Sequence, residues 1–212
     1  MEKTTIPEGQ IGDWAVKKFY VREEDAAFTA LRALMHGGRG AVPSGDYYAL
    51  MYRGAIVMSD TPNELSDQRM AIIGARGYVL VTGLGLGIIV DRMLQSEQYD
   101  PLCRDPGKDR ISLRVKHLTV VEKHLEVIQL VGPTLQGKYG DRLAIINADA
   151  FEWQPGDRRF DYAYHDIWTD ITSENLPGMR KLKRKYWPYL TATGKQRCWL
   201  EDECRRMGDG GE

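Results

Sequence analysis

The sequence predicts an α/β fold in which a mostly parallel sheet is flanked by helices. The chain has 212 residues, of which 42% are hydrophobic, and this is enough for one such domain with a sizeable core. From Tyr78 onward, β-prone runs alternate with helical patterns, as they do where helical crossovers join parallel strands. The first of these runs ends in Gly83, Gly85 and Gly87 and then continues as a helix. Backbone without side chains, followed by a helix N-terminus, is typical of nucleotide-type sites.

The residues before Tyr78 predict an N-terminal helix and a β-hairpin. Residues 23–36 have an amphipathic pattern that ends at Gly37 and Gly38, and we expect this helix to pack onto a larger body. Two β-prone runs, 47–51 and 55–59, flank a turn at Gly54 and predict the hairpin.

A further helix is predicted from Pro62 to about Ala75. Pro62 suits the first turn, and Thr61 with Glu64 has the spacing of a capping box.

The rest of the chain supplies the parallel sheet and its helices. We predict strands at 78–81, 118–121, 143–146, 162–164 and 196–200, and helices at 88–95, after 125 and at 179–190. Residues 97–110 predict a surface loop, and residues 207–212 predict a frayed tail. The C-terminal strands are therefore expected to be truncated. We expect a homodimer, or the N-terminal helix, to cover the exposed sheet edge.

Composition excludes several classes of protein. The net charge of −1 gives no global field for steering onto nucleic acid or an anionic membrane. The cysteines, Cys103, Cys198 and Cys204, match no zinc spacing, and the start of the chain has no apolar signal core. We expect a cytoplasmic protein without a membrane span.

Polar residues follow each predicted strand at the edge where ligands bind in open parallel sheets. Glu122 follows the second strand and is placed to accept ribose hydroxyls. Asp149 follows the third and is placed to accept an adenine amino group. His165, Asp166 and Asp170 follow the fourth and put an imidazole and carboxylates at the same pocket.

Together, these features resemble class I S-adenosylmethionine (SAM) dependent methyltransferases over about residues 47–200, in the spermidine synthase-like branch. The hairpin with a central glycine, the helix from Pro62 and the apolar Val81 before the first glycine are shared with that branch. The resemblance implies a Rossmann-like class I fold, with residues 77–212 as the SAM-binding domain and 1–76 as an N-terminal extension. The cofactor site that it implies comprises Gly83, Gly85, Gly87, Glu122, Asp149 and Ala150. Its catalytic residues would be Asp166, His165 and Asp170.

Three departures from that branch favour methyl transfer over aminopropyl transfer. Leu86 stands where spermidine synthases carry an aspartate, Val57 stands where they carry a glutamine, and residues 63–67 lack the expected tyrosine. Holding a polyamine cation needs several carboxylates or aromatic faces together. A methyltransferase acting on a small-molecule N or O acceptor is the leading hypothesis. The alternatives are an aminopropyltransferase that uses decarboxylated SAM and a non-catalytic assembly subunit.

Other chemistries fit the sequence less well. The glycine spacing is not the dinucleotide fingerprint, because Ile88 stands at the position of its third glycine. Asp166 also resembles the magnesium aspartate of catechol-type methyltransferases, with Glu201 or Asp202 as its only candidate partner, and we predict no metal. The Asn/Asp-Pro-Pro-aromatic motif of nucleic-acid amino-methyltransferases is not present in the sequence. The basic run 180–185 is typical of the solvent-exposed face of a helix, so nucleic acid is not an expected partner.

Overall fold

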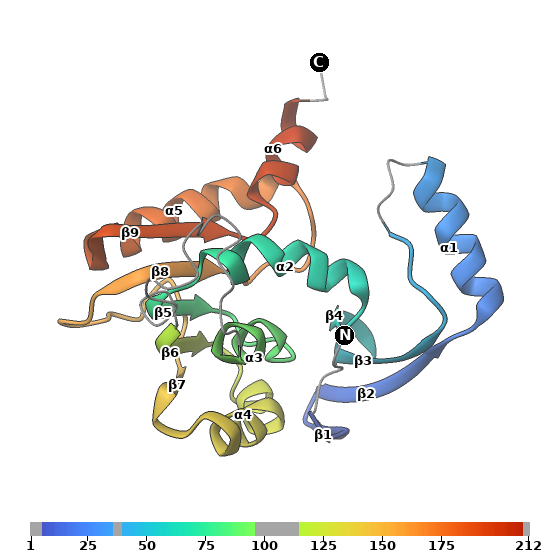
Figure 1. Ribbon diagram of the computed structural model, residues 1–212, viewed down its shortest axis with the longest axis horizontal. Coiled ribbons are helices and arrows are strands. Elements are labelled where there is room, and N and C mark those ends of the chain that lie inside the picture. The colour runs from blue at the N-terminus through green and yellow to red at the C-terminus, as the bar shows by residue number, and fades with distance from the viewer. Residues whose placement is uncertain (1–5, 36–39, 96–114, 210–212) are drawn as a thin grey trace, which may run out of the picture.

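A computed structural model describes residues 6–35, 40–95 and 115–209 of the chain. The predicted loop at 97–110 and Cys103 lie outside the described residues. The described chain forms two sheets, a four-stranded antiparallel sheet of order β1-β2-β3-β4 and a five-stranded parallel sheet of order β7-β6-β5-β8-β9 (Figure 1).

The parallel sheet is the Rossmann-like sheet that the sequence predicts. Its strands are β5 (Gly77–Thr82), β6 (Val115–Glu122), β7 (Leu143–Asn147), β8 (Phe160–His165) and β9 (Leu190–Cys198). The chain runs outward from β5 to β7 and then returns to place β8 on the other side of β5. The strand order therefore reverses between β5 and β8, and a ligand crevice is expected at the carboxyl ends there.

Helices cover both faces of this sheet. The helices are α2 (Pro62–Gly74), α3 (Ile88–Gln95), α4 (Leu125–Tyr139) and α5 (Leu176–Tyr186), with short 3-10 turns η1 (Gly140–Arg142), η2 (Ser173–Asn175) and η3 (Trp187–Tyr189). Val79 and Val81 of β5 belong to a core cluster with residues of α2, α3 and α4, whereas Leu80 packs with α5. Because side chains alternate along a strand, α5 covers the opposite face.

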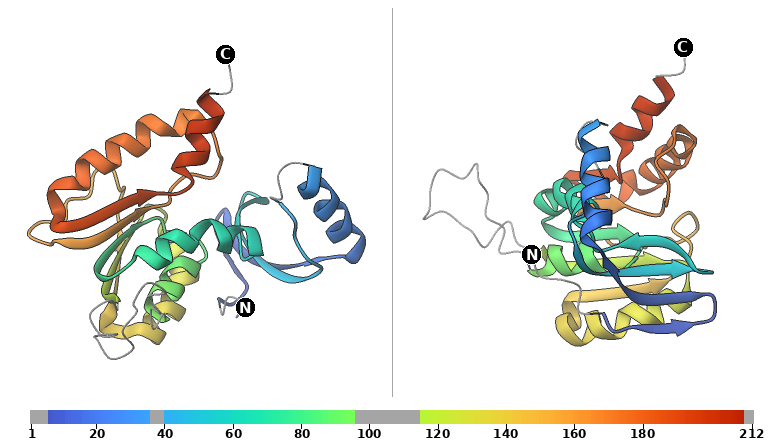
Figure 2. Two further views of the ribbon diagram at one scale, coloured as in Figure 1. Left: turned by 45° about the horizontal axis from the view of Figure 1, so that its top comes forward. Right: turned by 90° about the vertical axis from the view of Figure 1, so that its right-hand side faces the viewer.

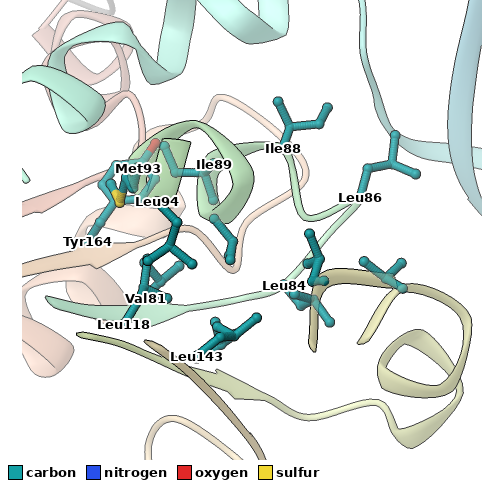
Figure 3. Close-up of a cluster of buried hydrophobic side chains, with 14 of the residues drawn as sticks. Val81, Leu84, Leu86, Ile88, Ile89, Met93, Leu94, Leu118, Leu143 and Tyr164 are labelled. Carbon is teal, nitrogen blue, oxygen red and sulfur yellow. The ribbon is translucent and has the colours of Figure 1, made fainter. Parts of the chain in front are cut away.

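The larger core cluster packs along the length of α3. Figure 3 shows Val81 of β5 and Leu118 of β6 gathered with Met93 and Leu94 of α3 and Tyr164 of β8. Each of these five side chains is at most 1% exposed. Burial of these apolar residues fixes α3 against the sheet and so fixes the turn before it.

The N-terminal part is more elaborate than the predicted helix and hairpin. The hairpin of β3 (Gly45–Tyr52) and β4 (Ala55–Ser59) is confirmed, but β1 (Gly9–Ile11) and β2 (Trp14–Val21) extend it into a sheet. The hairpin turns at Arg53 and Gly54, both with positive φ. The sequence analysis did not predict β1 and β2.

The expected packing of the N-terminal helix is wrong. The helix itself, α1 (Glu23–Met35), is confirmed, but Phe28 and Leu31 are 67% and 59% exposed. Figure 1 and the left view of Figure 2 place α1 at the opposite end of the molecule from β9. It therefore does not cover that sheet edge.

Two local predictions are also corrected. Thr61 precedes α2 but makes no side-chain cap, and its hydroxyl lies 3.1 Å from the hydroxyl of Ser59. Residues 207–209 of the predicted tail belong to α6 (Glu201–Asp209), a helix that buries Cys204 beside Met179 and Cys198, whereas 210–212 lie outside the described residues. None of the helices in the described ranges is both long and apolar enough to cross a bilayer.

Candidate functional site

Strand register brings the predicted site residues to one edge of the sheet. Thr82, the last residue of β5, is paired with Val121 on one side and with His165 on the other. Glu122, the last residue of β6, is paired with Asn147 at the end of β7. Residues one or two positions beyond these ends are therefore neighbours in space, although they are far apart in sequence.

The glycine turn approaches its neighbours too closely for side chains. Gly83, Gly85 and Gly87 all have positive φ, of 96°, 53° and 71°. A Cβ on Gly83 would collide with the backbone carbonyl of Asp166, and one on Gly85 with the sulfur of Met58. The turn thus requires glycine both for its conformation and for close contact with the elements around it.

Glu122 fixes the shape of this turn. Its carboxylate accepts hydrogen bonds from the backbone N–H of Leu84 and of His124, each at 2.8 Å. The residue is only 7% exposed, yet it lines the cleft described below. Each carboxylate oxygen retains a second acceptor position, and two acceptors side by side suit the two hydroxyl donors of a ribose.

Asp149 is held by its own loop at the end of β7. Its carboxylate accepts a hydrogen bond from the Phe151 N–H at 2.8 Å and lies 3.0 Å from the Lys123 ammonium. The Phe151 N–H, with help from Lys123, holds the pKa of Asp149 below its usual value. Asp149 is therefore an anion at neutral pH.

Asp166 lies just beyond the end of β8 and interacts with acidic residues of α2. Burial raises the pKa of Asp166 to about 7, and the carboxylates of Glu64 and Asp67 also raise it, while Gln68 lowers it. A carboxyl group whose pKa lies near neutrality can take up or release a proton under ordinary conditions.

These residues line one cleft of about 330 Å³. The parallel sheet contributes Gly83, Gly85, Glu122, Asp149, Ala150 and Asp166 to its walls. The antiparallel sheet contributes Trp14, Leu50, Val57 and Met58, and α2 contributes Glu64. Phe151 and Trp168 add aromatic surface. A concave, largely apolar cleft with a few convergent polar groups is typical of a small-molecule site.

Three predicted site residues lie elsewhere. His165 is fully buried outside the cleft, with its ring nitrogens 3.1 Å from the Thr82 hydroxyl and 3.3 Å from the Gln196 amide oxygen. Burial lowers the pKa of His165 to about 4, so the ring is neutral and structural at ordinary pH. Asp170 is exposed beyond the cleft wall, and Gly87 packs under Leu135 of α4. The fold therefore does not bring His165, Asp170 and Gly87 into the cleft with the other predicted site residues.

The magnesium alternative gains no support from the placement of its ligands. Glu201 forms ion pairs with Lys183 and Arg205 and lines a different crevice from Asp166. Within the described ranges, no three His, Cys, Asp or Glu side chains are grouped to hold a metal ion.

The part of the cleft that the antiparallel sheet builds was not predicted from the sequence. Trp14 is 8% exposed, and its ring lies 4.8 Å from the His124 ring and 4.9 Å from the Tyr52 ring. This contact seats the antiparallel sheet against the loop that follows Glu122. A tryptophan at residue 14 and a methionine in a hairpin carry no sequence signal for such a role.

Comparison with known proteins finds similarity of fold alone. No protein-family model matches the chain, and no curated protein sequence matches it. Among solved structures, the CcbJ methyltransferase from Streptomyces caelestis is 11% identical over 63% of this chain and 46% of its own, with a TM-score of 0.42. The SAH complex of DhpI is 18% identical over 63% and 52% of the two chains, with a TM-score of 0.41.

A third similar structure is a precorrin 8w decarboxylase from Methanobacterium thermoautotrophicum. It is 16% identical over 69% of this chain and 71% of its own, with a TM-score of 0.47. The chain spans about half the length of the first structures it matches. At these identities the comparisons identify neither an activity nor a substrate.

Proposed function

We propose that this protein is a SAM-dependent methyltransferase that acts on a small-molecule N or O acceptor. The observation that carries the proposal is the hydrogen bond from the Leu84 N–H to the Glu122 carboxylate, at the carboxyl ends of the parallel strands. It puts a carboxylate with free acceptor positions directly beside a turn whose glycines leave the backbone bare. This combination suits an adenosyl ligand whose ribose lies at Glu122 and whose amino-acid end lies along the turn.

The rest of the cleft fits the same ligand. Asp149, with the neighbouring Ala150 and Phe151, supplies an acceptor and apolar surface for an adenine ring. Leu86 stands where the spermidine synthase-like branch has an aspartate, and it is fully buried in the core and contributes no charge to the cleft. A donor that retains its carboxylate is therefore not repelled at this position, which favours SAM over decarboxylated SAM.

The residues of the chain would align the donor with the acceptor, exclude water from the cleft and remove a proton from the acceptor. Bound SAM would supply an electrophilic methyl group, whose bond to the sulfonium sulfur would break on transfer and leave a neutral thioether. Glu122 and the glycine turn would hold the donor, while the aromatic and apolar walls would exclude water from the cleft. Asp166, on the same cleft wall as Trp168, would accept the proton that the acceptor loses as its bond to the methyl carbon forms.

Titration calorimetry with SAM, decarboxylated SAM and methylthioadenosine tests this proposal. Binding that favours SAM supports methyl transfer, and preference for decarboxylated SAM supports aminopropyl transfer. If none of the three binds, the protein transfers neither a methyl nor an aminopropyl group from an adenosyl donor, and the non-catalytic alternative holds.

A further inference from the structure

The side chain of Met58, on β4 of the antiparallel sheet, is in contact with the glycine turn. Its Sδ accepts a hydrogen bond from the backbone N–H of Leu86 at 3.5 Å. A Cβ added to Gly85 would collide with the same sulfur atom. Met58 is half-buried and also lines the cleft. The sulfur therefore covers the turn at the cleft surface.

The hydrogen bond to Met58 differs in kind from the others that this turn makes. The N–H groups of Gly83, Leu84 and Gly87 donate to oxygen atoms at 2.8 to 2.9 Å. The Leu86 N–H donates to a thioether, which is a weak acceptor. A carboxylate is a much stronger acceptor for a backbone N–H, so a ligand that brings one would gain by replacing the sulfur.

The position of the turn favours an anion in this place. The turn leads directly into α3, and the unpaired N–H groups and dipole of a helix N-terminus attract negative charge. A ligand chain with an amine but no carboxylate would have to displace the sulfur without restoring the lost hydrogen bond. A nucleoside with no chain at all would leave Met58 where it is.

We propose that Met58 is a displaceable cap on the glycine turn, which the carboxylate of an adenosyl ligand displaces from the Leu86 N–H and which a nucleoside without an amino-acid chain leaves in place. The inference rests on the proposed function, because it assumes that the amino-acid end of the ligand lies along this turn. It extends that function by placing the carboxylate of the bound donor at the Leu86 N–H, where a residue of the antiparallel sheet competes with it.

The test compares S-adenosylhomocysteine (SAH) with methylthioadenosine, which shares the adenosine and sulfur but lacks the amino-acid end. Met58→Leu keeps an apolar side chain of similar size and removes the sulfur acceptor. Met70→Leu is the matched control, because Met70 lies on α2 outside the cleft and is 55% exposed. Calorimetry should show SAH binding tightened by roughly threefold to tenfold in Met58→Leu, as the loss of one competing hydrogen bond implies. Methylthioadenosine affinity should change by less than about twofold, and Met70→Leu should alter neither value.

A second readout follows the cap directly. In protein labelled with ¹³C at the methionine methyl groups, the Met58 resonance is the one that Met58→Leu removes. It should shift when SAH is added and stay in place with methylthioadenosine. The inference is overturned if Met58→Leu changes the SAH and methylthioadenosine affinities equally, or if the Met58 resonance does not shift on addition of SAH. Either result leaves the proposed function intact. Failure of the unmodified protein to bind either compound overturns the proposed function and the inference together.

Discussion

The carboxylate of Glu122 accepts a hydrogen bond from the backbone N–H of Leu84 at 2.8 Å, across 38 residues of sequence. The same carboxylate accepts from the His124 N–H at 2.8 Å. One side chain therefore ties the turn after β5 to the loop after β6. If a ribose also binds there, the residue that shapes the turn is the one that holds the ligand.

Glu122→Gln tests both roles of this residue. We expect SAH affinity to fall by roughly tenfold to a hundredfold, because hydrogen bonds to a charged acceptor contribute about 1.5–3 kcal/mol. The free energy of unfolding should fall as well, since the amide offers one acceptor oxygen where the carboxylate offers two. Calorimetry and denaturant titration measure the two effects, and Glu152→Gln is the exposed control. Unchanged SAH affinity in Glu122→Gln would contradict the ribose assignment.

Gly83→Ala should destabilise the fold at the turn. The position has φ of 96°, and the added Cβ would collide with the Asp166 carbonyl. Backbone strain and the clash together should cost on the order of 1–3 kcal/mol, which is visible as a lower Tm. Gly137→Ala in α4 is the matched control, because its Cβ meets nothing within 4 Å. That control should raise stability by about 0.5–1 kcal/mol, as alanine favours helix.

Asp166→Asn should reduce turnover and leave SAH binding nearly unchanged. An ionised carboxylate is needed to accept the proton of the acceptor, and burial raises the pKa of Asp166 to about 7. With any acceptor that supports methyl transfer, kcat/KM should therefore rise with pH through a midpoint near 7 and decline in more acidic solution. In Asp166→Asn the rate should fall by roughly a hundredfold or more and lose that midpoint. A pH profile that survives the substitution would assign the proton transfer to another group.

His165→Gln should flatten the acid side of the stability curve. Burial lowers the pKa of His165 to about 4 from its ordinary 6.5, so the unfolded chain binds more protons than the folded chain between these values. The stability that depends on this ring is complete above about pH 6.5 and is lost as the pH falls toward 4. Urea titrations at several pH values should show a steeper decline for the unmodified protein than for His165→Gln. Parallel declines would show that the ring is not held neutral by burial.

The periodic patterns in the sequence were sufficient to predict most of the parallel sheet. Strands at 78–81, 118–121 and 143–146 were predicted because runs of apolar residues between turn signals are typical of strands buried on both faces. The strands β1 and β2 were missed because Lys17 and Lys18 interrupt the apolar pattern of β2. These lysines lie where that strand extends away from the core and is exposed, so solvent rather than packing sets the residue type.

The sequence by itself determined which residues are candidates for binding or catalysis. The sequence shows where a turn accepts only glycine, because that requirement depends on local conformation. It also shows which carboxylates follow strands, and parallel strand direction brings those to one edge of the sheet. Tertiary structure alone decided which of those residues share a cleft. His165 and Asp166 are adjacent in the chain, yet successive residues at a strand end point to opposite sides, so one is buried beside Tyr186 and the other lines the site. Met58 and Trp14 reach the cleft only because packing places one sheet against the other, and such long-range contacts leave no periodic trace in sequence.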